Sequence, residues 1–269
     1  MDPLVYEGQM LSDTDLERYA RQVIMPPIGE DGQKKLLASK VLVVGAGGLG
    51  APVILYLAAA GIGYITIVDD DQVSRSDLNR QIIYKNEDIG SDKAKVAAKA
   101  ALLVNPGIQT SNIVTRLNRA NAHRLVTAHD IIIDCSDNAD TRYLLGDTAH
   151  HNRRPLVFGG AVRMEGQLAV FQSSVPPYVG TACYRCVFPS IPDKKQAPGC
   201  SEAGILGPVT GIIGSLQALE TIKLCLGQDS SLTGSLLLIE AGTAEFVRIT
   251  TAPRQDCSCC SADRMATQS

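Results

Sequence analysis

The stretch that decides the fold is residues 40–69, which read KVLVVGAGGLGAPVILYLAAAGIGYITIVD. Its first five residues form a short, valine-rich run that suits a strand buried on both faces of a parallel sheet. The run leads into Gly45-Ala46-Gly47-Gly48-Leu49-Gly50, then into an apolar helix over residues 51–60 and a second strand over residues 64–68 that ends on Asp69. This order predicts a nucleotide site, because the glycines let phosphate approach free helix N–H groups and the acid can bind a ribose hydroxyl. The stretch alone leaves the identity of the nucleotide open.

Length and composition bound the class of protein. The chain has 269 residues, of which 45% are hydrophobic, enough for a large α/β domain with a sizeable core. The net charge is −3 and the basic residues are scattered, so we expect no nucleic-acid partner. No run reaches about 18 apolar residues and no signal sequence opens the chain, so we expect a cytoplasmic protein without a membrane segment. The eight cysteines then indicate metal binding or catalysis rather than disulfides.

Polar side chains follow the predicted strands. Residues 73–84 are rich in side-chain donors and suit a ligand-facing loop. Lys93 opens a predicted helix over residues 93–104, where the helix dipole disfavours a cation unless an anion lies nearby; the alternative is an ordinary surface lysine. Asp137 follows a buried strand over residues 131–135, at the sheet edge where ligands bind. It is either a Mg²⁺ ligand or the cap of the next helix.

The N-terminal residues predict a short helical arm. We expect a helix over residues 15–23, capped by Thr14, followed by an amphipathic turn over residues 32–37. Arg18 and Arg21 lie on this helix, and pattern alone assigns them to a solvated face. Other predicted elements are strands over 108–114, 156–160 and 167–171, helices over 121–128 and 208–226, and a final hairpin over 236–240 and 245–250.

Two Cys-x₂-Cys pairs lie far apart in the C-terminal third of the chain. Cys183-Tyr184-Arg185-Cys186 follows a change to proline-rich composition, and Cys257 and Cys260 form the second pair. Together they predict a closed, four-thiolate structural zinc site that joins the C-terminal tail to a loop. Cys259 is a spare thiol or an alternative ligand. Cys200 lies in a loop before a helix, where a thiol can become nucleophilic, but its position alone does not favour a chemical role.

The chain from about residue 12 to residue 260 resembles the ThiF/MoeB/HesA family, prokaryotic relatives of the ubiquitin-activating enzymes. The stretches that carry the resemblance are Arg18–Gln22, Gly45–Gly50, Asp69–Asp71, Leu78–Gln81, Lys93, Asp134–Asn138, Cys183–Cys186 and Gly211–Leu224. It implies a Rossmann-like doubly wound α/β sheet that binds ATP, with a C-terminal β extension and the structural zinc site. It also implies an enzyme that uses Mg²⁺ and ATP to adenylylate the C-terminal glycine of a ubiquitin-like sulfur carrier ending in Gly-Gly.

The domain division follows from this resemblance. We expect an N-terminal helical arm (1–30), a Rossmann-like ATP-binding region (31–172), a zinc-linked loop, helix and C-terminal strands of the same domain (173–260), and a disordered tail (261–269).

The resemblance also implies site residues. Nucleotide contacts are expected from Gly45, Gly47, Gly48, Gly50, Asp69, Asp71, Asn79, Arg80 and Lys93. Asp137 is expected to bind Mg²⁺, Arg21 to reach the active site of the partner subunit in a homodimer, and Cys200 to act in sulfur transfer. Zinc is expected on Cys183, Cys186, Cys257 and Cys260.

One residue departs from the family's pattern, and the pathway stays open. The family usually has Asn where this chain has Asp77, which adds a negative charge near the phosphates. Some segments look closer to MoeB, whose carrier serves molybdopterin synthesis, and others to ThiF, whose carrier serves thiamine thiazole synthesis. No rhodanese-like domain follows, so we expect sulfur to come from another protein such as a cysteine desulfurase or a rhodanese.

Two other classes of function fit part of the sequence. A nicotinamide-dependent oxidoreductase would use the same glycines and Asp69, but it would leave Arg80, Lys93 and Asp137 without a role. A non-catalytic family member should have lost at least one of those three side chains, and all three are present.

Overall fold

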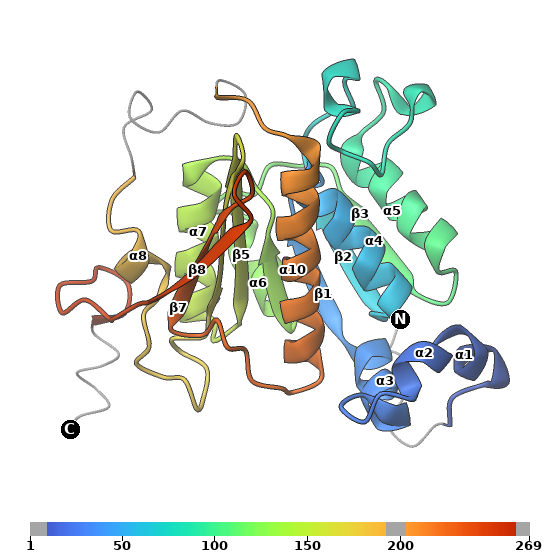
Figure 1. Cartoon of the computed structure of the whole chain (residues 1–269), viewed down its shortest axis with the longest axis horizontal. Coiled ribbons are helices and arrows are strands. Elements are labelled where there is room, and N and C mark those ends of the chain that lie inside the picture. Colours follow the sequence, from blue (N-terminus) through green and yellow to red (C-terminus); the bar gives the residue numbers. More distant parts are fainter. Residues whose placement is uncertain (1–9, 192–202, 262–269) are drawn as a thin grey trace.

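The computed structural model describes residues 10–191 and 203–261, and these are built around one eight-stranded sheet (Figure 1). The strand order is β3-β2-β1-β4-β5-β6-β7-β8. The parallel part consists of β1 (Lys40–Val44), β2 (Tyr64–Val68), β3 (Gln109–Ile113), β4 (Ile131–Asp134) and β5 (Leu156–Val162). The antiparallel part consists of β6 (Glu165–Phe171), β7 (Ser235–Glu240) and β8 (Glu245–Thr250).

Helices cover both faces of the parallel part. The helices α4 (Gly50–Ala60), α5 (Lys93–Val104) and α10 (Gly207–Cys225) pack on one face, and α6 (Ala122–Thr127) and α7 (Ala139–His151) pack on the other (Figure 1). The central strands explain why. In β1, Val41 and Val43 belong to the core under α4, whereas Leu42 and Val44 belong to the core under α7. Alternating side chains of a strand point to opposite faces, so a continuous apolar run is buried twice.

The sheet is doubly wound, as expected, and its order reverses at β1. The chain leaves β1 through α4 to reach β2 on one side, and it later enters β4 on the other side. The loops that follow β1 and β4 therefore diverge, and a crevice opens between them at the carboxyl ends of the strands.

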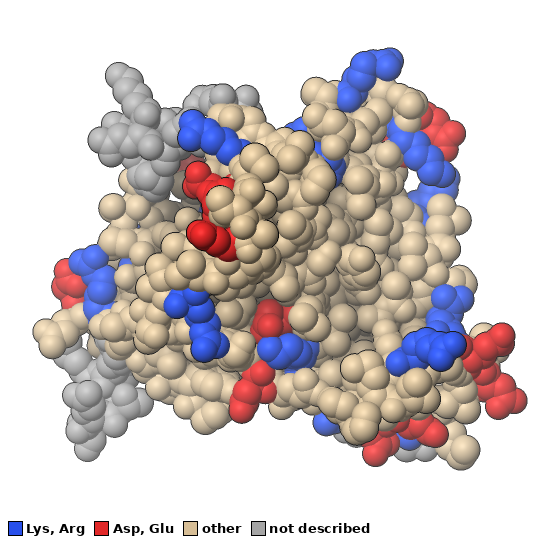
Figure 2. All heavy atoms as spheres, in the orientation of Figure 1, with Lys and Arg blue, Asp and Glu red and all other residues tan. Residues whose placement is uncertain are grey.

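The C-terminal β extension is confirmed as an antiparallel meander of β6, β7 and β8. The predicted hairpin strands match β7 and β8 within one residue. β8 forms the edge of the sheet and is exposed along its whole length. Figure 2 shows basic and acidic side chains in small mixed groups on this face of the molecule, and a broad area with few charges over α10 and α4.

The N-terminal arm differs from the prediction of one helix over residues 15–23. The structure has α1 (Asp13–Arg18) and α2 (Ala20–Val23), which are interrupted at Tyr19. The Tyr19 side chain is 2% exposed and its hydroxyl accepts a hydrogen bond from Asn105 Nδ2 at 2.8 Å, so a tertiary contact outweighs helix continuity. The helix cap is also not Thr14, because the Ser12 hydroxyl accepts from the backbone N–H of Asp15.

Three short elements and one longer helix complete the described chain. The predicted turn over residues 32–37 is part of the ten-residue helix α3 (Gly29–Ala38). The remaining elements are α8 (Tyr184–Val187) and the 3₁₀ turns Arg75–Asp77 and Asn86–Asp88. Within residues 10–191 and 203–261, no helix combines the length and apolar character needed to cross a membrane. The predicted reactive Cys200 and nearly all of the predicted tail lie outside the described residues.

Candidate active site

The glycine loop after β1 has its conformation dictated by close packing. Gly45 has a φ of +98°, and a Cβ there would lie 2.6 Å from the carbonyl oxygen of Cys135. A Cβ on Gly50 would lie 2.1 Å from the carbonyl oxygen of Gly45. These two glycines let the loop fold tightly beside the residues that follow β4, and Gly45, Gly47 and Gly48 line an open cavity. Gly50 is thus a packing residue, and it does not line the cavity.

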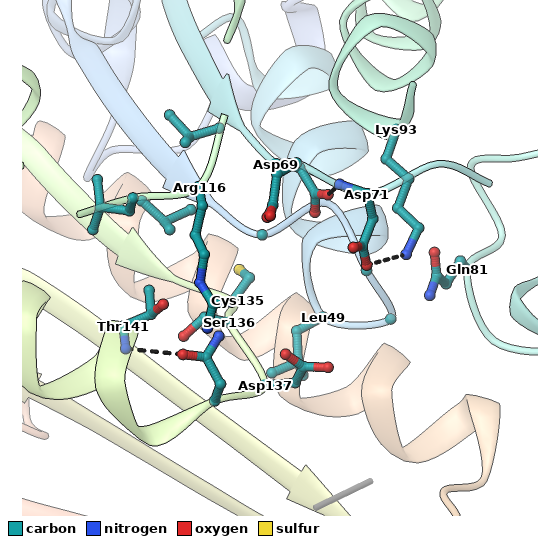
Figure 3. A pocket seen from close by; sticks show the side chains of 18 of the residues that line it. Leu49, Asp69, Asp71, Gln81, Lys93, Arg116, Cys135, Ser136, Asp137 and Thr141 are labelled. Carbon is teal, nitrogen blue, oxygen red and sulfur yellow. Dashed lines mark hydrogen bonds and ion pairs between the residues drawn. The ribbon is translucent and has the colours of Figure 1, made fainter. Parts of the chain in front are cut away.

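The cavity lies in the crevice at the carboxyl ends of the parallel strands and has a volume of about 390 Å³. Figure 3 shows it from close by. Its walls come from the glycine loop, the residues after β2, the loop after β3, the start of α5 and the residues after β4. This is the edge at which ligands of open α/β sheets bind.

Asp69 ties the end of β2 to the glycine loop. Its Oδ2 accepts a hydrogen bond from the backbone N–H of Ala46 at 2.7 Å, and its Oδ1 accepts from the N–H of Asp71 at 2.8 Å. Burial raises the pKa of Asp69, although the two backbone donors oppose that shift. Asp69 and Asp71, from which nucleotide contacts were expected, both line the cavity.

Lys93 and Arg80 meet around one buried acid, Asp77. Lys93 is 6% exposed, and its Nζ lies 3.0 Å from Asp71 Oδ2 and 3.5 Å from Asp77 Oδ2. Arg80 Nη2 lies 3.3 Å from Asp77 Oδ1, and Nη1 donates to the carbonyl of Ser76 at 2.8 Å. Burial alone would lower the pKa of Lys93, but its hydrogen bond to Asp71 and the nearby carboxylates raise it. The two cations predicted to hold phosphate therefore lie on the same wall of the cavity.

Asp137 follows β4, and its capping alternative is wrong. The cap of α7 is Asn138, whose side-chain oxygen accepts from the backbone N–H of Thr141 at 2.9 Å (Figure 3). Asp137 is exposed and lines the cavity. Its carboxylate is a hard oxygen donor of the kind that Mg²⁺ prefers.

Sequence reasoning missed part of the cavity wall. Thr115, Arg116 and Leu117 follow β3, and Arg142 lies on α7, where its Nη2 donates to the carbonyl of Ser136 at 2.9 Å. Figure 3 shows the Arg116 side chain entering the cavity beside Ser136. The position of residues 115–117 directly after a predicted strand was the one available signal, because parallel strands bring their carboxyl ends to one edge.

Besides Gly50, two further predicted site residues do not line this cavity. Asn79 does not line it, and its side-chain oxygen accepts from Arg80 Nη1 at 3.2 Å. Arg21 is exposed on α2.

A second, larger cavity adjoins the first and was not predicted. Its volume is about 760 Å³, and Asp137, Arg142 and Ala161 line both cavities. Its apolar wall comprises Tyr143, Phe158, Tyr184, Val187, Phe188, Leu238, Ile239 and Val247. It runs along α7 and the antiparallel strands β6, β7 and β8, so the β extension lines a cavity that adjoins the first.

The two Cys-x₂-Cys pairs converge, although 70 residues of chain separate Cys186 from Cys257. The sulfur atoms of Cys183, Cys186, Cys257 and Cys260 all lie within 4.8 Å of one another, and all four residues are buried. Tetrahedral Zn–S bonds of about 2.3 Å place thiolates about 3.8 Å apart. The observed separations of 3.8, 3.5 and 3.4 Å are close to that value. The donor set therefore fits zinc, and Cys259 is not part of it.

The fold places the chain in the doubly wound α/β class, with a cavity at the carboxyl ends of its parallel strands, a second groove beside that cavity and a four-cysteine cluster. The ThiF family model matches residues 19–260, and the chain belongs to the ThiF family. The resemblance found in the sequence is thereby confirmed.

Relatives of known name support the same placement. The chain is 41% identical to "SAMP-activating enzyme E1" of Haloferax volcanii, over 93% of this chain and 90% of that protein. It is 42% identical to "Sulfur carrier protein adenylyltransferase" of Thermus thermophilus, over 91% of each chain. Among solved structures, E. coli MccB with MccA-N7isoASN shares the fold, with a TM-score of 0.78, 22% identity, and 93% of this chain and 75% of that chain covered.

Proposed function

We propose that this chain uses Mg²⁺ and ATP to adenylylate the C-terminal glycine of a ubiquitin-like sulfur carrier protein. The observation that carries the proposal is the junction of the two cavities at Asp137 and Arg142. The first cavity has a glycine loop and two cations on one wall, which suit a triphosphate. The second is larger and is lined mainly by apolar side chains, which suits the tail of a peptide. A carboxyl terminus and an α-phosphate would meet at their junction.

The chemistry needs positioning and charge neutralisation rather than a base. The carboxylate oxygen of the carrier attacks the α-phosphorus, a new P–O bond forms, and the bond to the pyrophosphate leaving group breaks. The nucleophile is already ionised, so no proton has to be removed. Arg80 and Lys93 neutralise the charge that grows on pyrophosphate, and Asp137 would hold Mg²⁺, which supplies further neutralisation when bound.

The test of this function is exchange of labelled pyrophosphate into ATP. We expect exchange to require both Mg²⁺ and a carrier that ends in Gly-Gly, with MoaD-type and ThiS-type carriers assayed side by side. A carrier that lacks its last glycine is the matched control. Binding of NAD in place of ATP, with no exchange, would instead support an oxidoreductase.

The working unit is proposed to be a homodimer with shared sites. Three side chains of the arm form hydrogen bonds within the chain. Arg18 bonds to Val104, Tyr19 to Asn105, and Gln22 to Ala60. Arg21, which lies among them, is exposed, and its side chain makes no hydrogen bond or ion pair with any residue in the described ranges. Its neighbours therefore hold the arm firmly while Arg21 stays available to the site of a second subunit.

The surface over α10 and α4 is the proposed contact between the subunits. It carries few charges (Figure 2), and Tyr56, Ile212 and Leu219 are exposed there. A Cβ on Gly211 of α10 would meet nothing within 4 Å, so a partner helix can approach closely at that point. Gly214 serves a different purpose, because its Cβ would lie 2.5 Å from Pro52 of α4 in the same chain.

Cys200 is proposed to act in sulfur transfer after adenylylation, with sulfur supplied by a separate desulfurase or rhodanese. Attack of a carboxylate on ATP uses no thiol. Cys200→Ser is therefore expected to leave pyrophosphate exchange near the wild-type rate and to slow formation of the thiocarboxylate. Loss of exchange in a folded Cys200→Ser protein would contradict this division of roles.

The cysteine cluster is proposed to bind structural zinc. We expect about one zinc per chain, and Cys183→Ser should lower the melting temperature by on the order of 10 °C, because metal binding contributes directly to folding. The backbone N–H of Arg254 also donates to the sulfur of Cys186 at 3.3 Å, which favours a thiolate there. Cys225→Ala, outside the cluster on α10, is the control and should keep full zinc content. A folded wild-type protein without zinc would refute the assignment.

A further inference from the structure

Asp77 is buried among donors and cations at the wall of the nucleotide cavity. It is 6% exposed, and its Oδ2 accepts from the backbone N–H and the hydroxyl of Ser74, each at 3.0 Å. Its Oδ1 accepts from Gln81 Nε2 at 2.9 Å. Both carboxylate oxygens are thus anchored, and the side chain cannot swing away when a ligand enters.

The same carboxylate is the shared counter-ion of Arg80 and Lys93, at 3.3 and 3.5 Å. Burial alone would raise the pKa of Asp77, but the Ser74 bonds and the two cations together lower it, so the group is ionised at neutral pH. Asp71 also pairs with Lys93, but its side chain is 68% exposed, so water screens its charge. Asp77 is therefore the anion that most directly opposes phosphate at this wall.

We propose that Asp77 sets the affinity of this site for phosphate groups, by competing with the bound nucleotide and with pyrophosphate for Arg80 and Lys93. It acts through these two cations and is a positioning residue. The consequence is weaker ground-state binding of ATP and faster release of pyrophosphate. The inference rests on the proposed function only for the identity of the nucleotide, since the cations and the acid are placed by the fold.

The competition is expected to weaken phosphate binding. A cation that already faces a buried carboxylate exerts less attraction on an incoming phosphate, because the two opposite charges partly cancel at the position of the ligand. The carboxylate also repels the phosphate directly. Replacing Asp77 by asparagine keeps the size of the side chain and an oxygen that can accept from the Ser74 N–H, while it removes the charge.

The test compares Asp77→Asn with wild type in equilibrium binding. Three probes are used: a non-hydrolysable ATP analogue, inorganic pyrophosphate and adenosine. We expect Asp77→Asn to bind the first two about tenfold more tightly, the order expected for one unit charge near a phosphate. Adenosine has no phosphate, so its affinity should stay unchanged. Inhibition of turnover by pyrophosphate should strengthen by a similar factor.

A matched control uses another buried ion pair. Glu220 is also 6% exposed, and it bonds to Lys223 at 2.8 Å on α10, outside both cavities. Glu220→Gln should lower stability to a comparable degree and leave the binding of all three probes at wild-type strength. This separates the effect of the Asp77 charge from a general loss of folding stability.

The outcomes are distinct. Unchanged or weaker pyrophosphate binding in folded Asp77→Asn overturns the inference, as does an equal change for adenosine. If the asparagine variant does not fold, Asp77→Ser, which also removes the charge, replaces it and is expected to show the same changes in binding of the three probes. A wild-type protein that binds pyrophosphate but not the ATP analogue contradicts the proposed function, and the pyrophosphate comparison still decides the role of Asp77.

Discussion

Arg80→Ala is expected to slow carrier-dependent pyrophosphate exchange about a hundredfold or more, the usual effect of losing one charged contact to a transition state. Arg80 is held in place by Asp77 at 3.3 Å and by the carbonyl of Ser76 at 2.8 Å, so its guanidinium is already ordered at the cavity wall. Because Arg80 is also expected to contact the phosphates of bound ATP, kcat/KM for ATP should fall by more than kcat.

The control for Arg80→Ala is Arg124→Ala, which removes an exposed arginine from α6, outside both cavities. It should leave exchange at the wild-type rate. Circular dichroism and the melting temperature establish that both variants are folded. Exchange at full rate in folded Arg80→Ala would remove the basis for adenylyl transfer at this cavity.

Mixing two inactive variants is expected to restore activity if the sites are shared between subunits. Arg21→Ala lacks the side chain proposed to reach the partner subunit, and Lys93→Ala lacks the cation of the cavity itself. Random re-pairing makes about half of the dimers mixed, and each mixed dimer holds one site in which both residues are intact. Activity should therefore approach about a quarter of that of wild type.

Two controls make the mixing experiment decisive. Each variant incubated alone should stay inactive, and native mass spectrometry with one mass-labelled variant should show mixed dimers. If mixed dimers form and no activity returns, Arg21 does not act in the partner's site. If the protein is monomeric at the assay concentration and wild type is nevertheless active, the shared site is wrong.

The nucleotide cavity was largely predictable because its parts follow strands. Gly47, Gly48, Asp69, Arg80, Lys93 and Asp137 all line the cavity, as expected. All but Arg80 come soon after a predicted parallel strand or open the next helix, and parallel strands bring those positions to one edge of the sheet. Arg80 lies in the crossover loop over residues 73–84, which was expected to face a ligand. Asn79 and Gly50 belong to the same motifs but serve internal contacts, which spacing alone cannot reveal.

The N-terminal arm and the second groove were less accessible to sequence reasoning. Helix periodicity favoured a continuous helix through Tyr19, but burial of that ring against Asn105 breaks it. The groove draws its wall from α7, the Tyr184–Phe188 segment and strands β6 to β8, which are distant in sequence. No local pattern marks a cavity whose walls meet only when the sheet is complete.

By itself, the sequence determined the doubly wound sheet, the glycine loop and the pairing of cysteines into one cluster, because these depend on local periodicity, backbone sterics and ligand type. Only the tertiary structure decided how the charge of Asp77 is compensated. Its partners Arg80 and Lys93 follow it by 3 and 16 residues, and the fold brings both to one carboxylate at the cavity wall. The energy of a buried charge depends on which groups surround it in space, and the fold alone specifies those groups.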